Sequence, residues 1–555
     1  MPSPPRADST PPASPGSSGT VETAGSINCG AWISRWARER PKALAWADDH
    51  RRCNFEQAEN RIRRLTGWLA GRGVGRGDRV ALWMGNRGAT LEGLFATARR
   101  GAIALPLNAR LTPGEIAFQL DDATPSVVFV EDRWVASARE AFRIMREPPP
   151  RLLVVSEYEE ALAASLPIDD WRPVDPDDPM ILMYTSGTTG QPKGALLPHR
   201  KTLYNCRNAE LFFDLRPSDR VLVVAPLFHS LGLQILALPA AYAGAGIVLQ
   251  EGFDPQRVWR TIAREGITYH GGVPTLHERL LAALERGDPF DTPPASLRFA
   301  FTAGAAADPA MIRAYHDRGL LVKQGYGQTE TSILTCIDAE RALSKAGSVG
   351  CPVRHVELRL IDPETIDGDV AGWRDVGPGG IGEIVVRGPT TMIGYWKRPE
   401  ATAETLREGW LRTGDLATRD DDFDLTLVGR AREMYISGGE NVYPAEVEAA
   451  LVAHPAIAEA AVVAVPDPEW GEVGRAHVVL EPGQTLDRDA LDRWLGTRLA
   501  RFKQPREFVL EKALPRTASG KIQKHRLHPR PDVPDAPVPP SDCPTRAPDP
   551  RRGIP

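Results

Sequence analysis

The stretch from Tyr184 to Gly194, YTSGTTGQPKG, has the composition of a loop that binds an anion. Its glycines let backbone N–H groups approach a ligand closely, its threonines and serine add hydroxyl donors, and its lysine adds positive charge. The apolar run at residues 180–183 just before it is typical of a buried strand. The lysine does not follow the Walker pattern, because Pro192 precedes it and Gly194 follows it. The stretch therefore predicts a loop that holds the phosphates of a nucleoside triphosphate.

A flexible linker rich in glycine and threonine is the alternative interpretation of this stretch. Linkers seldom follow a buried apolar strand and rarely keep such a lysine, so we favour phosphate binding. The candidate phosphate-binding residues are Thr185, Ser186, Gly187, Thr188, Thr189, Gly190 and Lys193.

Short apolar runs alternating with helical stretches predict the elements that must position this loop. The expected strands are 80–84, 103–105, 127–130, 152–155, 181–183, 221–225, 247–249 and 299–302. Asn54 is a typical helix N-cap, and Thr112 with Glu115 forms a capping box that has Pro113 at the first helical position. Strands alternating with helices indicate a largely parallel sheet with helices on both faces.

The pattern changes in the second half of the chain. From about Arg354, alternating apolar residues and glycine turns predict a smaller, twisted β region. After Gly429 and Arg430 a separate unit begins, with helices expected over 445–451 and 488–499 and strands over 460–465 and 476–480. We therefore expect an α/β fold with a large N-terminal domain over 27–430, made of α/β subdomains and the twisted β region, and a small α+β C-terminal domain over 433–528.

Composition limits the classes of protein that fit. The 555 residues are 42% apolar and 25% charged, which is ordinary globular composition but too long for a single core. The net charge of −5 gives no basic footprint for nucleic acid. Six scattered cysteines without a CxxC pair, and no apolar targeting segment, favour a reduced, cytoplasmic protein. No run approaches the roughly 20 apolar residues of a membrane span, and proline-rich residues 1–26 and 529–555 are expected to be disordered tails.

Four more stretches could carry chemistry. They are APLFH at 225–229, YGQTE at 326–330, WLRTGD at 410–415 and LPRTASGKIQK at 514–524. Each is weak alone: His229 fits an ordinary core or surface histidine, Glu330 a helix-end carboxylate, Asp415 a turn residue and Lys521 a solvated charge.

Together and in this order, with GRAREMYISGGENVYPAEVE at 429–448, these stretches closely resemble the AMP-forming acyl-CoA synthetase branch of the adenylate-forming enzymes. The resemblance spans roughly residues 29 to 526 and is nearest to fatty-acid and aryl-acid CoA ligases. It implies that a carboxylic acid reacts with ATP and Mg²⁺ to give acyl-AMP and pyrophosphate, and that coenzyme A then accepts the acyl group.

The resemblance implies a role for each matching residue. The loop from Thr185 to Lys193 would grip the β- and γ-phosphates, Glu330 would hold magnesium with help from Thr185, and Asp415 and Arg430 would contact the ribose. The stretches around adenine would be Gly304, Ala305, Ala306, Gln324, Gly325, Tyr326 as a stacking face, Gly327 and Thr329. His229 would gate or orient the acid.

The resemblance assigns the C-terminal part to a mobile domain. Lys521 would reach the α-phosphate and the attacking carboxylate, so we expect Lys521→Ala to lower adenylate formation sharply while sparing thioester formation from supplied acyl-AMP. The domain would swing at a hinge that includes Arg432, bringing in a loop with Gly438, Gly439 and Glu440 for the thiol step. Arg432 stands where the family commonly has Asp or Lys, and Glu433 where it has Asp, which puts the hinge energetics in question.

The acid itself is less well defined by the sequence. The acyl pocket is expected near His229, 269–273 and 302–306. The apolar residues after His229 offer no cationic clamp for a second carboxylate, which argues against a dicarboxylate. The small residues expected to leave room for the acyl group are Gly271, Gly272, Gly304 and Ala305. A medium- or long-chain fatty acid is our first expectation, and an aryl or cinnamic-type acid the second.

Several alternatives stay open at this point. A carrier-protein thiol could replace coenzyme A as acceptor, and a luciferase-like oxidase shares the same motifs. A non-catalytic nucleotide-binding relative is disfavoured because Lys193, Glu330, Asp415, Arg430 and Lys521 are all present. The sequence does not give the oligomeric state, and a homodimer is an open possibility.

Overall fold

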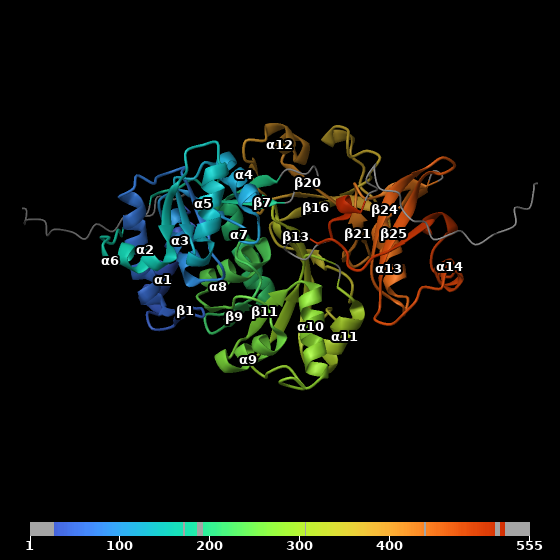
Figure 1. Cartoon of the computed structure of the whole chain (residues 1–555), viewed down its shortest axis with the longest axis horizontal. Helices are drawn as coiled ribbons and strands as arrows, with labels where there is room; N and C mark the ends of the chain where they lie inside the picture. Colours follow the sequence, from blue (N-terminus) through green and yellow to red (C-terminus); the bar gives the residue numbers. More distant parts are fainter. Residues whose placement is uncertain are drawn as a thin grey trace, which may run out of the picture.

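The computed structural model describes residues 27–169, 172–185, 192–305, 307–437, 440–516 and 522–527 (Figure 1). Within these ranges the chain forms two large mixed sheets, a smaller antiparallel sheet and a separate C-terminal α+β unit. No helix in the described part of the chain has the length and apolar character needed to cross a membrane. The expected α/β fold is confirmed, although the single parallel sheet predicted from the strand pattern is two sheets.

The first large sheet has seven strands, of which the five from β7 to β6 in spatial order are parallel. In spatial order they are β18 (Gly394–Tyr395), β8 (Lys193–Pro198), β7 (Pro179–Thr185), β4 (Ile103–Pro106), β3 (Arg79–Trp83), β5 (Val127–Val130) and β6 (Arg151–Val154). β8 runs antiparallel to both β7 and β18, so the parallel pattern ends at one edge.

The second large sheet has nine strands with a parallel centre and antiparallel edges. In spatial order they are β15 (Cys351–Pro352), β14 (Ser332–Cys336), β13 (Leu321–Gln328), β12 (Phe299–Thr302), β11 (Tyr269–Gly272), β9 (Arg220–Val223), β10 (Gly246–Leu249), β1 (Leu44–Ala47) and β2 (Arg52–Asn54). β14 runs antiparallel to β13, so here too the parallel pattern ends at an edge.

Helices cover both faces of each large sheet, because their parallel strands are apolar on both sides. In β3, Val80 and Leu82 pack into the central core between the two sheets, whereas Ala81 and Trp83 pack into an outer core. The central helices are α1 (Trp32–Glu39), α2 (Phe55–Ala70), α3 (Gly88–Arg99), α6 (Tyr158–Ala163), α7 (His199–Phe213) and α8 (Leu238–Ala243). The outer helices are α4 (Pro113–Ala123) and α5 (Val135–Ile144) on the first sheet, and α9 (Pro255–Glu265), α10 (Pro274–Glu285) and α11 (Pro309–Asp317) on the second.

Local sequence explains where several of these helices begin. The Asn54 side chain accepts from the Gln57 backbone N–H and the Gln57 side chain accepts in return, which completes a capping box at α2. Thr112 and Glu115 do the same at α4, with Pro113 at its first position. Both predicted helix starts are confirmed.

The twisted β region and the C-terminal unit follow. The region contains β16 (Glu357–Ile361), β17 (Gly382–Arg387), β20 (Trp410–Arg419), β19 (Leu406–Arg407) and β21 (Leu425–Arg430), and α12 (Pro399–Thr405) comes directly before β19 in the sequence. The C-terminal unit contains β23 (Glu440–Val442), β22 (Tyr435–Ser437), β25 (Gly471–Leu480), β24 (Ile457–Asp467), β26 (Glu507–Leu510), α13 (Pro444–Val452) and α14 (Arg488–Gly496). It lies at the opposite end of the molecule from α6 (Figure 1).

Several predicted boundaries differ from the observed ones, and two that extended beyond the element have a local explanation. β9 ends at Val223 and not at residue 225, because the chain turns there toward Pro226. α14 ends at Gly496 and not at Leu499, consistent with the low helix propensity of glycine.

Candidate active site

The β7–β8 hairpin brings Thr185 and Lys193 opposite each other. The two residues are paired across the hairpin, and Thr185 Oγ1 donates to the Lys193 carbonyl at 3.3 Å. Tyr184 is not available to a ligand through its hydroxyl, which donates to Asp122 Oδ2 of α4 at 2.6 Å. The loop residues Ser186, Gly187, Thr188, Thr189 and Gly190 lie outside the described residues. The described part of the hairpin therefore has one hydroxyl and one ammonium at the end that leads into the loop.

The turn between β13 and β14 carries Glu330 and is tightly constrained. A Cβ atom on Gly327 would lie 1.7 Å from the Ser332 carbonyl oxygen, so only glycine fits there. The Gln328 N–H donates to Thr331 Oγ1 at 3.1 Å, inside the turn. The Met392 N–H donates to the Glu330 carbonyl at 2.7 Å. The backbone around Glu330 is thus held from both sides.

A buried lysine lies beneath this turn. Lys201 of α7 has no exposed surface, and its Nζ donates to the hydroxyl of Ser332. Burial lowers the pKa of Lys201 to about 7, although the Glu330 carboxylate opposes that shift. Ser332 itself has a left-handed backbone, with φ of 60°, and is buried.

Tyr395 of β18 joins the two halves of the site. Its hydroxyl donates to Glu330 Oε1 at 2.9 Å. Its ring centroid lies 5.4 Å from Lys193 Nζ. Burial, and then the Glu330 charge, raises the pKa of Tyr395, so the phenol stays protonated and remains a donor.

A second acidic centre lies on the other side of β13. Asp415 is buried, and its Oδ2 accepts from the Tyr326 hydroxyl at 2.6 Å and from Gln328 Nε2 at 2.5 Å. Its Oδ1 pairs with Arg430 Nε at 2.8 Å. The backbone places this pair, because Asp415 of β20 is opposite Arg430 of β21. Burial, and then the Asp415 charge, raises the pKa of Tyr326.

Two protein-family models match the chain. The model described as AMP-binding enzyme matches residues 33–396, and the model described as AMP-binding enzyme C-terminal domain matches residues 446–521. The first match alone covers more than half of the 555 residues. The chain belongs to the AMP-binding enzyme family.

Curated relatives of this AMP-binding enzyme are CoA ligases. A feruloyl-CoA synthase of an Amycolatopsis species is 40% identical over 504 residues, covering 90% of this chain and 98% of that protein. An indoleacetate–CoA ligase of Aromatoleum aromaticum is 40% identical over 505 residues, covering 89% and 96%. The long-chain-fatty-acid–CoA ligase FadD13 of Mycobacterium tuberculosis is 32% identical over 503 residues, covering 90% and 97%.

Solved structures give the same assignment. The ATP-bound MatB of Rhodopseudomonas palustris has a TM-score of 0.82 and 29% identity, covering 90% of this chain and 98% of that one. The o-succinylbenzoate CoA synthetase MenE of Bacillus subtilis, in complex with ATP and magnesium, has a TM-score of 0.79 and 29% identity, covering 89% and 98%. This AMP-binding enzyme is accordingly an AMP-forming acid–thiol ligase that uses ATP, Mg²⁺ and coenzyme A.

The donors at the acid turn fit a magnesium ion. Glu330 Oε1 is held by Tyr395, and Oε2 has no hydrogen-bond partner among the described residues. Thr185 supplies a hydroxyl oxygen. Mg²⁺ takes hard oxygen ligands of this kind and usually keeps waters and substrate phosphates around it. Bound there, the ion would neutralise phosphate charge.

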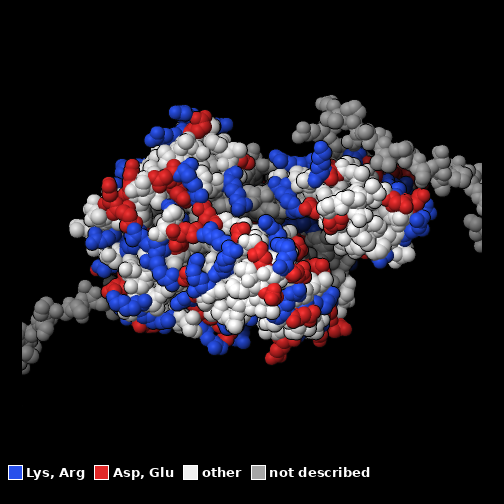
Figure 2. Space-filling model, turned by 60° about the horizontal axis from the view of Figure 1, so that its bottom comes forward, with Lys and Arg blue, Asp and Glu red and all other residues white. Residues whose placement is uncertain are grey.

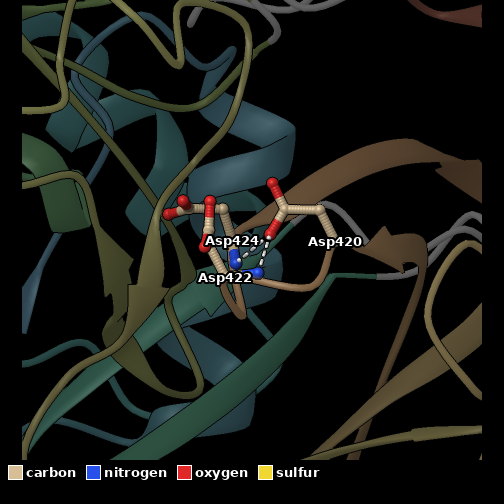
Figure 3. A group of neighbouring side chains, drawn as sticks. All are labelled: Asp420, Asp422 and Asp424. Carbon is tan, nitrogen blue, oxygen red and sulfur yellow. Dashed lines mark hydrogen bonds between the residues drawn. The ribbon is translucent and has the colours of Figure 1, made fainter.

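Three other carboxylates gather at a different place. Asp420, Asp422 and Asp424 lie between β20 and β21, and the Asp420 carboxylate accepts from the backbone N–H groups of the other two (Figure 3). Lys345 Nζ lies 2.7 Å from carboxylate oxygens of both Asp420 and Asp422, and Arg341 pairs with Asp424 at 2.7 Å. Two protein cations therefore already compensate most of the negative charge of this cluster.

The stretches expected around adenine lie at the carboxyl ends of β12 and β13. Gln324 is buried, and its Nε2 has no hydrogen-bond partner among the described residues. Gly325 is required by packing, because a Cβ there would lie 2.8 Å from the Phe301 ring. Gly304, with φ of 91°, and Ala305 are exposed after β12, and Ala306 lies outside the described residues. Thr329 is half-buried beside Glu330.

His229 precedes a π-helical segment, η4 (Leu231–Ala237), and its ring lies 4.6 Å from that of Phe228. Part of the space expected for the acyl group beside Gly271 and Gly272 is occupied by protein side chains. A Cβ on Gly271 would lie 2.9 Å from the Leu236 side chain, and one on Gly272 would lie 2.8 Å from Leu276. The expectation that both glycines leave open space is therefore wrong, because leucines from neighbouring helical segments occupy it.

The C-terminal residues are described in part. Gly438, Gly439 and Lys521 lie outside the described residues, and Glu440 begins β23. Lys524 Nζ lies 2.5 Å from Glu433 Oε2 and 2.8 Å from Glu448 Oε1. These contacts tie the end of the chain to the segment after β21 and to α13.

Sequence analysis missed three residues that hold the site. Gln328 lies inside the YGQTE motif but was not singled out. Tyr395 lies in the stretch IGYWKRPE, whose only signal is a Gly–Tyr pair at a strand edge. Lys201 gives no signal, because a lysine in a polar helix start predicts exposure.

Proposed function

We propose that this enzyme activates an aromatic carboxylic acid as its acyl-AMP and transfers the acyl group to coenzyme A. One observation supports the proposed site most strongly: a continuous series of contacts runs from Asp415 through Gln328 to the Glu330 turn, and from Glu330 through Tyr395 to Lys193. A ribose acceptor, a metal acceptor and a phosphate cation would thereby lie along one series of contacts. That order matches the order of groups along ATP.

The proposed roles follow from charge and donor type. Asp415 would accept hydrogen bonds from the ribose hydroxyls, with Arg430 beside it. Glu330 and Thr185 would hold magnesium, and Lys193 with its loop would hold the β- and γ-phosphates. The site would bring an anionic carboxylate against an anionic phosphate, which requires fixed positive charge and alignment.

The chemistry proceeds in two balanced steps. A carboxylate oxygen attacks the α-phosphorus, the bond to the bridging oxygen breaks, and pyrophosphate leaves with its electron pair. The thiolate of coenzyme A then attacks the acyl carbonyl, and AMP leaves. We propose that Lys521 acts in the first step only, so that Lys521→Ala lowers pyrophosphate exchange by about 10²-fold or more while acyl-AMP is still consumed by coenzyme A.

The choice of an aromatic acid rests on two supports. Relatives that are 40% identical are named for feruloyl and indoleacetate substrates, both aromatic. Leu236 and Leu276 also occupy the space above Gly271 and Gly272, which shortens the region proposed for the acyl group. A flat ring needs less depth than a long chain, so a compact aromatic acid fits better.

A panel of acids tests the substrate. Pyrophosphate release would be followed with ATP, Mg²⁺ and each of a hydroxycinnamic acid, an arylacetic acid, a medium-chain and a long-chain fatty acid, with and without coenzyme A. We expect the highest kcat/KM for an aromatic acid and full turnover only with coenzyme A. A long-chain acid that outperforms every aromatic one would overturn the substrate choice but leave the reaction class intact.

A fatty acid is the second candidate. The relative FadD13, named for long-chain fatty acids, is 32% identical over 90% of this chain. Leu233 and Ile235 of η4 are buried and apolar and would accept an alkyl chain as readily as a ring. A carrier-protein thiol as acceptor is tested in the same assay by supplying a phosphopantetheinylated carrier in place of coenzyme A.

A further inference from the structure

Tyr395 lies between the two oppositely charged groups that the proposed function assigns to the triphosphate and its metal. Its hydroxyl donates to Glu330 Oε1 at 2.9 Å, and its ring centroid is 5.4 Å from Lys193 Nζ. No ion pair joins Lys193 to Glu330 in the part of the chain that the structure describes. One phenol side chain therefore contacts both charges, each through a different part of its surface.

The backbone explains why Tyr395 reaches both. β18 pairs with β8 so that Tyr395 is opposite Ala195, two residues along the strand from Lys193 and on the same face. The Trp396 N–H donates to the Gly194 carbonyl at 2.7 Å. Upstream in the same segment, the Met392 N–H donates to the Glu330 carbonyl at 2.7 Å. Residues 392–396 thus connect the β7–β8 hairpin of one sheet to the Glu330 turn of the other through backbone hydrogen bonds.

Without such a residue, an ammonium and a carboxylate this close to each other would be free to form a direct ion pair. In that pair the lysine N–H donors would be unavailable to phosphate, and the carboxylate oxygen would be unavailable to magnesium. A cation over a ring is held more weakly than a cation on a buried carboxylate. The lysine can therefore leave the ring for a phosphate, while the hydroxyl fixes one carboxylate oxygen and leaves the other for the metal.

We propose that Tyr395 is a positioning residue that keeps Lys193 and Glu330 apart and aims the Glu330 carboxylate at the magnesium ion of ATP. The proposal rests on the proposed roles of Lys193 and Glu330. The hydroxyl orients the Glu330 carboxylate toward the metal, and the ring holds Lys193 where it can reach the phosphates.

Two substitutions separate the two parts of the side chain. Tyr395→Phe removes only the hydroxyl, so the apparent KM for Mg²⁺ at saturating ATP should rise several-fold, with little change in the KM for the acid. Tyr395→Leu removes the ring as well, so the KM for ATP at saturating Mg²⁺ should also rise. Pyrophosphate exchange measured over a grid of Mg²⁺ and ATP concentrations gives both constants.

The chain offers a matched control. The Tyr158 hydroxyl of α6 donates to Glu92 Oε2 at 2.8 Å, the same phenol–carboxylate bond in the N-terminal region and far from the β13–β14 turn (Figure 1). Tyr158→Phe should lower thermal stability and leave both constants at wild-type values. A structural role for Tyr395 alone would make its phenylalanine variant behave like this control.

The outcomes distinguish this inference from the proposed function. If Glu330→Gln changes the Mg²⁺ dependence and Tyr395→Phe does not, the positioning role is wrong and the proposed metal site stands. If neither variant changes it, the proposed metal site is wrong as well. A Tyr395→Phe enzyme whose KM for Mg²⁺ rises while its melting temperature stays near that of wild type supports the inference.

Discussion

The two large sheets are built alike but support their site residues differently. Each is parallel at its centre and ends in antiparallel strands, β7–β8–β18 in one and β13–β14 in the other. At the first edge, Thr185 and Lys193 are half-buried and Lys193 rests over a ring. At the second, the turn that carries Glu330 sits on a fully buried lysine–serine contact between Lys201 and Ser332.

This difference separates a fixed acid from an adjustable cation. The Glu330 turn is closely packed and hydrogen-bonded, because Gly327 has no room for a side chain and backbone donors hold the turn from within and from residue 392. The lysine side chain is long and makes only a weak contact in the described structure. A metal site needs fixed ligand positions, whereas a phosphate site profits from a cation that follows its ligand.

Both sheets lie under a surface on which charges of both signs alternate. Figure 2 shows lysine and arginine interspersed with aspartate and glutamate over the face drawn. This agrees with the net charge of −5 and with an enzyme of small-molecule substrates, which needs no large basic surface patch.

Removing the fixed acid should have the largest effect. We expect Glu330→Gln to lower the rate of pyrophosphate exchange by about 10²–10³-fold, because a neutral amide leaves phosphate charge uncompensated by the metal. The measurement is exchange of labelled pyrophosphate into ATP at saturating substrates. A loss of only a few-fold would mean that the β13–β14 turn does not carry the metal ligand.

Removing the adjustable cation should cost less and appear in a different constant. Lys193→Met should raise the KM for ATP by about tenfold, since its charge is one of several donors around the phosphates. Steady-state kinetics over a range of ATP concentrations check this. If Lys193→Met lowers kcat as strongly as Glu330→Gln does, the inferred difference between a fixed acid and an adjustable cation is wrong.

Acid should destabilise the nine-stranded sheet more than the seven-stranded one. Burial lowers the pKa of His277 in α10 to about 4 and that of His270 in β11 well below its usual value, so two such histidines lie on the nine-stranded sheet, whereas His199, whose pKa is also lowered to about 4, directly follows β8 of the seven-stranded one. These histidines stay neutral when folded but take up protons when unfolded, so stability is complete above pH 6.5 and is lost as the pH falls toward 4.

One substitution tests this pH dependence. His270 is buried and its Nε2 has no hydrogen-bond partner among the described residues, so His270→Phe removes its proton uptake at little cost in packing. Its unfolding free energy should fall less between pH 7 and pH 4.5 than that of wild type, by on the order of 1–3 kcal/mol. Denaturant titrations at both pH values measure it. Equal losses in the two proteins would contradict a neutral buried histidine.

The smallest effect is expected beneath the acid turn. Lys201→Met replaces a buried ammonium with an apolar side chain of similar volume, and such changes are often neutral or stabilising. We expect the unfolding free energy to rise by on the order of 1 kcal/mol and the exchange rate to stay within a few-fold of wild type. A marked loss of stability would show that the lysine charge is needed to hold the Ser332 turn.

Much of the fold was predictable because its signals are local. Asn54 and Thr112 cap helices through partners three residues away, and the apolar strands 127–130 and 299–302 match β5 and β12 at both ends. The prediction of one sheet was wrong because strand order depends on how the segments pair. The composition of an apolar run does not indicate which of the two sheets it joins.

The sequence by itself determined the reaction class, since the order and spacing of its loops are properties of the chain. It also determined where the glycine-rich loop begins, since the apolar strand directly before it is a local signal. Only the tertiary structure decided which side chains meet: Tyr395 reaches Glu330 across 65 residues and Lys201 reaches Ser332 across 131. Such contacts depend on sheet pairing and burial, which no local pattern records.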